Sequence, residues 1–148
     1  MDFISVSPAL KVRNLNAYNG SEQKDAFHRA ARAFLKKVAA ALQLPSGSFD
    51  IRTNEGGIAV AGETHLHGET INAWLSNGAF GGETYLLYRS CNGRKDHSGG
   101  ANHTVDIKDL CDERAQSQVL TDMHRVSQAG LAMEPAAQEA APSRRPRI

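Results

Sequence analysis

The amino-acid sequence predicts an α+β protein in which one long amphipathic helix packs on an antiparallel sheet of three to five strands, followed by short C-terminal helices. Three observations carry this prediction: a helical stripe of apolar residues, several short runs of alternating apolar and polar residues after it, and glycine-rich turns between those runs. Because short connections favour antiparallel neighbours, the alternating runs are expected to form a single sheet.

The long helix is expected over residues 22–44, directly after Ser21, which is a typical N-cap residue. Pro45, Ser46 and Gly47 end it. Its apolar residues recur at the i, i+3, i+4, i+7 spacing and therefore share one buried face: Phe27, Ala30, Ala31, Phe34, Leu35, Val38, Ala41 and Leu42.

Alternation predicts strands over residues 49–53, 58–67, 70–76 and 83–90. In the second of these, Thr64 and Leu66 share one side of the strand, and the side chains at 63, 65 and 67 share the other. After a polar loop, Thr104 or Asp106 is expected to cap a short helix through Ile107, and a second helical stretch follows.

At 148 residues, 41% hydrophobic and 22% charged, the chain is long enough for one domain, expected over residues 1–130. The composition then changes to Ala, Glu, Gln and Pro, which predicts a disordered tail over residues 131–148. The formal net charge of +1 argues against a strongly basic nucleic-acid binder or an acidic mimic. Two cysteines, no membrane-length apolar run and no signal-like N-terminus favour the cytoplasm.

The segment from Leu86 to His103 concentrates charged residues and glycines immediately after a predicted strand. Recognition and chemistry are usually carried by loops of this kind on a rigid scaffold. The predicted binding site therefore comprises this loop with two aromatic residues from the sheet: Arg89, Arg94, Lys95, Asp96, His97, His103, Trp74 and Tyr88.

A zinc site is one alternative function for the histidines and cysteines. His65 and His67 project from the same side of a predicted strand, and Cys91 and His103 are further ligand types. The paired CxxC spacing of structural zinc sites is absent, so no metal or other cofactor is expected.

Nuclease or phosphoesterase chemistry is a second alternative. Asp96 and His97 supply a carboxylate and a general base, and the neighbouring Arg94 and Lys95 supply cations for a phosphate. The loop lacks a nucleophile, a base and an orienting group in series, and we therefore expect no enzymatic activity.

Nucleic-acid binding is a third alternative, through a basic side of the long helix formed by Arg29, Arg32, Lys36 and Lys37. Trp74, Tyr85 and Tyr88 are candidates for base stacking. A basic helix side is more often simply solvated, and the net charge near zero weakens this interpretation.

Protein binding is the function that we expect, because Trp, Tyr and Arg are the residue types that dominate interface energies. For a partner with a basic surface, the acidic residues Glu63, Glu69 and Glu83 would take the place of the cations.

Two segments, NEGGIAVAGETHLHGETI and LLYRSCNGRKDHSGGANH, resemble small uncharacterised accessory proteins encoded by bacteriophages and prophages of Proteobacteria. The resemblance covers residues 49–109 and rests on the glycines together with Arg89, Cys91, Arg94, Asp96, Asn102 and His103. It transfers no catalytic residue. It implies a phage protein that acts in the host cytoplasm as a non-enzymatic inhibitor of a host protein or ribonucleoprotein defence complex, for example an anti-CRISPR protein.

Overall fold

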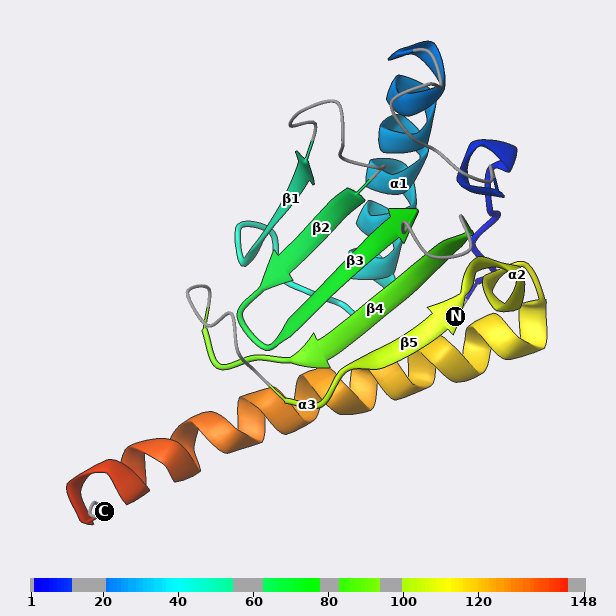
Figure 1. The fold of residues 1–148 in the computed structure, drawn as a ribbon. Helices are drawn as coiled ribbons and strands as arrows, with labels where there is room; N and C mark the ends of the chain where they lie inside the picture. The colour runs from blue at the N-terminus through cyan, green and yellow to red at the C-terminus, as the bar shows by residue number, and fades with distance from the viewer. Residues whose placement is uncertain (1, 12–20, 55–62, 78–82, 94–99, 144–148) are drawn as a thin grey trace.

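The structure is a computed structural model that describes residues 2–11, 21–54, 63–77, 83–93 and 100–143 (Figure 1). A short 3-10 helix, η1, precedes the long N-terminal helix, the sheet and two C-terminal helices. The elements in chain order are η1 (Pro8–Lys11), α1 (Ser21–Ala41), β1 (Phe49–Asn54), β2 (Glu63–Gly68), β3 (Ile71–Asn77), β4 (Thr84–Ser90), β5 (His103–Asp106), α2 (Ile107–Leu110) and α3 (Glu113–Ser143).

The predicted N-terminal helix is confirmed as α1, with a precise stop at its C-terminal end. Gln43 has a φ of 58°, its N–H bonds to the carbonyl of Ala40, and the Leu44 N–H bonds to the carbonyl of Ala39. Such a pair of bonds around a left-handed residue is the Schellman motif, which satisfies carbonyls at a helix end. The helix therefore ends at Ala41, three residues before the predicted boundary at 44.

The five strands form one sheet whose spatial order equals the chain order, β1-β2-β3-β4-β5, and all neighbours are antiparallel. The four predicted strands correspond to β1 to β4. The fifth strand differs from the prediction, because residues 103–106 were expected to end the loop and cap a helix. They pair with β4 instead, with His103 opposite Tyr88, and form the second edge strand of the sheet.

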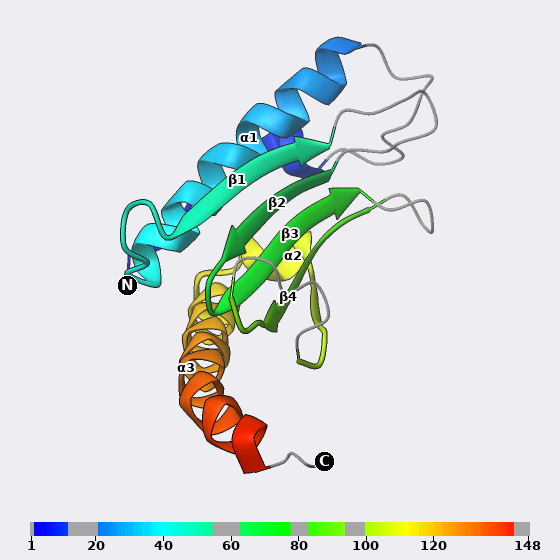
Figure 2. The same cartoon turned by 90° about the vertical axis from the view of Figure 1, so that its left-hand side faces the viewer.

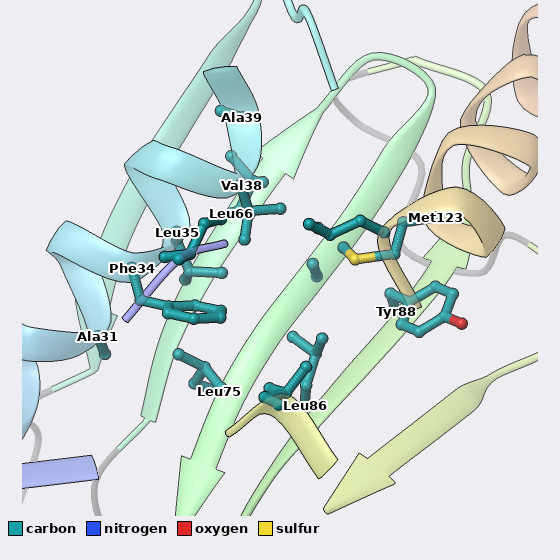
Figure 3. Packing of buried hydrophobic residues seen from close by; sticks show 14 of the residues in the cluster. Ala31, Phe34, Leu35, Val38, Ala39, Leu66, Leu75, Leu86, Tyr88 and Met123 are labelled. Carbon is teal, nitrogen blue, oxygen red and sulfur yellow. The ribbon is translucent and has the colours of Figure 1, made fainter. Parts of the chain in front are cut away.

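The helices lie on one side of the sheet (Figure 2). α1 packs on β1 and β2, and α3 packs on β3 and β4. The core fills the space between the layers, where Phe34, Leu35 and Val38 of α1 meet the inward side chains of the strands, and Met123 comes from α3 (Figure 3). Interdigitated apolar side chains of this kind supply most of a small domain's stability.

α3 differs from the predicted short C-terminal helices, because it is one helix of 31 residues. Its backbone continues to Ser143, into the segment whose composition predicts a disordered tail. Before it, α2 is short as expected, although the side chain of Asp106 at its N-cap position makes no capping hydrogen bond. None of the helices in the described ranges is long and apolar enough to cross a membrane.

Candidate functional site

Strand alternation divides the sheet into two faces. The side chains that point toward α1 and α3, such as Leu66, Ala73 and Leu86, are fully buried. No helix of the described segments covers the opposite face (Figure 2), which we call the open face. By the strand register it carries, from β1 to β5, Asp50, Arg52, Glu63, His65, His67, Asn72, Trp74, Ser76, Tyr85, Leu87, Arg89, Thr104 and Asp106.

Four side chains of the open face, from three adjacent strands, form the group that we call the Trp74 cluster: Glu63, His65, Trp74 and Arg89. The His65 ring is stacked on the Trp74 indole, with centroids 5.2 Å apart and planes 9° from parallel. Arg89 Cζ lies over the indole, 5.3 Å from its centroid. Glu63 Oε1 lies 3.0 Å from His65 Nε2. The register produces this group, because Trp74 sits directly opposite His65 and diagonally from Arg89.

The Trp74 cluster holds the indole upright between two partners. His65 lies on β2 and Arg89 on β4, and these strands flank β3 on opposite sides. The indole is therefore contacted from both neighbouring strands of β3, by the His65 ring and by the Arg89 guanidinium. A nucleobase stacks on the face of an aromatic ring, and the His65 ring and Arg89 already lie against the face of this indole. Tryptophan combines a large apolar surface with an N–H donor, a combination that is common in protein interfaces.

Tyr88 lies on the covered face of the sheet together with His103, and away from Trp74 and Arg89 of the predicted site. It is 3% exposed, and its hydroxyl donates a 2.6 Å hydrogen bond to Asp122 Oδ2 of α3. Burial and this bond raise the pKa of the Tyr88 phenol well above its usual range. A phenol that stays protonated serves as a hydrogen-bond donor and not as a base.

His103 and Asp122 complete the surroundings of Tyr88. The His103 ring stacks on Tyr88 with centroids 5.0 Å apart, and its Nδ1 lies 3.8 Å from Asp122 Oδ2. Arg125 donates two bonds to Asp122 Oδ1, at 3.0 and 2.7 Å. The hydrogen bond from Tyr88 is the main reason why the pKa of Asp122 is lowered, against the opposing effect of burial, and Arg125 lowers it further. This network fastens α3 to β4 and β5.

The centre of the predicted loop, with Arg94, Lys95, Asp96 and His97, lies outside the described residues. The two ends of the loop are described, and backbone hydrogen bonds fix both of them. At the C-terminal end, the N–H of Gly100 bonds to the carbonyl of Ser90. The N–H groups of Cys91 and Gly93 bond to the carbonyls of Thr70 and Glu69, and Cys91 Sγ donates to the carbonyl of Gly68. The first residues of the loop, which follow β4, are therefore held against the turn between β2 and β3.

The basic residues of the nucleic-acid alternative lie on α1, across the sheet from the Trp74 cluster. Arg29, Lys36 and Lys37 are exposed, whereas Arg32 Nη1 donates a 2.9 Å hydrogen bond to the carbonyl of Ile51 on β1. The helix packs on the covered side of the sheet, whereas Trp74 and Tyr85 belong to the open face.

The residues of the zinc alternative are separated in the structure. His65 and His67 do point from the same side of β2, as predicted, but Cys91 and His103 belong to other environments. Among the described residues, no group of three or more His, Cys, Asp and Glu side chains is placed to hold a metal ion.

Asp122 and the pairing of His65 with Trp74 are parts of the site region that the sequence alone did not reveal. The sequence did carry a signal for the pairing of His65 with Trp74, because alternation places both residues on the outward side of adjacent strands.

Comparison with known proteins finds no matching family model, no similar curated protein and no similar solved structure.

Proposed function

We propose that the protein is a non-enzymatic binding protein that engages a protein partner stoichiometrically through the open face. The single observation that carries the proposal is the Trp74 cluster, an indole held between His65 and Arg89 on a sheet face without a helix cover. Trp and Arg side chains that are ordered before binding lose little conformational entropy in the complex, which is how interface hot spots gain affinity.

The charges around the Trp74 cluster indicate the character of the partner. On the open face and at the adjoining strand ends, the described acidic residues outnumber the described arginines, Arg52 and Arg89. The acidic residues are Asp50, Glu63, Glu69, Glu83 and Asp106. An acidic rim around an aromatic centre complements a protein surface that is itself basic.

A basic protein surface is typical of proteins that bind nucleic acid. Together with the resemblance to phage accessory proteins, this supports a host defence complex, such as a CRISPR effector, as the partner. In this proposal the open face covers the nucleic-acid-binding surface of the complex and thereby inhibits it.

Charge reversal on the rim tests the proposal. Bacteria that carry a defined CRISPR system are infected while they express the protein, and plaque numbers report inhibition. We expect the wild-type protein to raise plaque numbers and the Glu63→Lys, Glu83→Lys variant to lose this effect. A Lys36→Glu, Lys37→Glu variant reverses two charges on the helix side, a change of equal size and opposite sign, and is expected to remain active.

A co-precipitation assay with the purified effector complex then identifies the contact. Binding by the wild-type protein is expected to survive nuclease treatment and to be lost in the Arg89→Ala variant. Release of the partner by nuclease would contradict the proposal. Full binding by both the Glu63→Lys, Glu83→Lys variant and the Arg89→Ala variant would contradict it as well.

Nucleic-acid binding through α1 is the second candidate, because Arg29, Lys36 and Lys37 are exposed along one helix. Phosphate contacts make affinity fall steeply with salt. Oligonucleotide binding with a steep salt dependence that Lys36→Ala, Lys37→Ala flattens would favour this function over the first.

A further inference from the structure

A groove of about 840 Å³ lies between the first half of α1 and the edge strand β1. Three arginines line it, Arg29 and Arg32 from α1 and Arg52 from β1, against one carboxylate, that of Asp25. The groove therefore offers an excess of positive charge on a protein whose net charge is only +1. It lies at the edge of the sheet and is distinct from the Trp74 cluster.

The backbone of β1 borders this groove with an unpaired edge. In the described part of the sheet, β1 pairs with β2 alone. The carbonyl of Ile51 accepts a hydrogen bond from Arg32 of α1, which indicates that this carbonyl points away from β2. The N–H and C=O groups of one strand residue point to the same side and alternate along the strand, so those of Phe49 and Thr53 also point outward.

The arginines of the groove are accessible to a ligand. Arg29 is exposed on α1. The side chain of Arg52 is 81% exposed, and its ion pair with Asp50, at 3.6 Å, is of the solvated kind that contributes little energy. Guanidinium groups bind carboxylates through two parallel hydrogen bonds, which gives such a groove a preference for planar anions.

We propose that this groove binds an extended acidic peptide segment, which adds to the sheet as a strand beside β1. Carboxylates of the peptide meet Arg29 and Arg52. A peptide N–H replaces Arg32 on the carbonyl of Ile51, and the released guanidinium pairs with a further carboxylate. The six residues of β1 span roughly 20 Å, enough for several bonds of such a ladder.

The groove fits a peptide better than a nucleic-acid strand. Its described lining contains no Phe, Tyr or Trp on which a base could stack. Its open backbone edge, in contrast, is the feature that strand addition requires. The proposal stands independently of the partner assigned to the open face.

Fluorescence anisotropy with defined probes tests the charge requirement. The probes are an end-blocked peptide of alternating Glu and Val, the same peptide with Lys in place of Glu, and a single-stranded oligothymidylate. We expect saturable binding of the Glu peptide and about tenfold weaker binding to the Arg29→Ala, Arg52→Ala variant. The Arg114→Ala variant removes an exposed arginine on α3 and is expected to bind like the wild-type protein.

Amide hydrogen exchange tests strand addition separately from charge. With the Glu peptide bound, exchange is expected to slow at the outward amides of Phe49, Ile51 and Thr53 and to stay unchanged at Asp50 and Arg52. Failure of the Glu peptide to bind, equal binding by the double variant, or unchanged exchange at the outward amides would overturn the proposal. Binding of the oligothymidylate that the double variant loses, without binding of the peptide, would make the groove a phosphate site instead.

Discussion

The side-chain amide of Gln116 binds both backbone polar groups of Ile4, which lies 112 positions earlier in the chain. Gln116 Oε1 accepts a 2.8 Å hydrogen bond from the Ile4 N–H, and Nε2 donates a 2.7 Å bond to the Ile4 carbonyl. Nε2 also donates to the carbonyl of Leu110 at 2.9 Å. One buried side chain of α3 thus holds the N-terminal segment and α2 together.

Replacement of Gln116 by Leu is expected to lower the free energy of unfolding by about 2–4 kcal/mol. The change keeps an apolar side chain of similar size but leaves up to three backbone groups without partners in a buried place. Chemical denaturation measures the loss. The Gln118→Leu variant changes an exposed glutamine of the same helix and is expected to stay within about 0.5 kcal/mol of the wild-type protein.

Replacement of Phe34 by Ala is expected to lower the free energy of unfolding by about 3–5 kcal/mol. Phe34 is 4% exposed and packs in the core between α1 and the sheet (Figure 3), so its removal leaves a cavity. The matched variant is Phe3→Ala, because Phe3 is 40% exposed. Equal effects of the two changes in a denaturation experiment would contradict the burial of α1 on the sheet.

The hydrogen bond from Tyr88 to Asp122 is expected to make stability depend on acid pH. The folded state lowers the pKa of Asp122 below the ordinary value of 3.8, so the group stabilises the fold fully above that pH. This contribution is lost as the pH falls through the lowered pKa. The Tyr88→Phe variant is therefore expected to lose less stability than the wild-type protein when the pH falls from about 6 to about 2.

Thermal denaturation across this pH range measures the difference. The Asp122→Asn variant removes the titrating group and is expected to flatten the same part of the profile. Asp109→Asn, on the exposed surface of α2, serves as the control. Parallel profiles for the wild-type protein and Tyr88→Phe would show that the bond does not set the pKa of Asp122.

Gly100, at the C-terminal end of the polar loop, packs closely against Ser90. Its N–H bonds to the carbonyl of Ser90, and a Cβ on this residue would collide with the Ser90 hydroxyl. We expect Gly100→Ala to lower the free energy of unfolding by about 1 kcal/mol or more. In the Gly100→Ala, Ser90→Ala double variant most of this loss should be recovered, since the clashing oxygen is gone. Purely additive losses in a double-mutant cycle would exclude the clash as the cause.

The helix and the first four strands were predictable because their side chains repeat at the period of each structure. Phe27, Phe34 and Val38 recur at the helical spacing, and the alternation in β2 matches the observed burial. The strand β5 escaped prediction because it has only four residues and leads directly into a helix. So short a run shows too little alternation to be distinguished from a loop that caps a helix.

The sequence predicts the side of a strand on which each candidate residue lies, but not which residues of different strands come into contact. Alternation places Tyr88 on the opposite side from Arg89, which already separates these two members of the predicted site. The contact between His65 and Trp74 depends on the register between β2 and β3. That register is set by packing and turn geometry, which no local pattern reports. The position of Asp122 beneath Tyr88 likewise depends on how α3 docks on the sheet.

The agreement between strand order and chain order also bears on how the protein folds. Each strand pairs with its neighbour in the chain, so each pairing closes only a short loop and costs little chain entropy. The contact between Ile4 and Gln116, in contrast, joins distant parts of the chain. Hairpins are therefore expected to form the folding nucleus, and the N-terminal segment should dock after the rate-limiting barrier. Accordingly, Gln116→Leu should accelerate unfolding and leave the refolding rate almost unchanged.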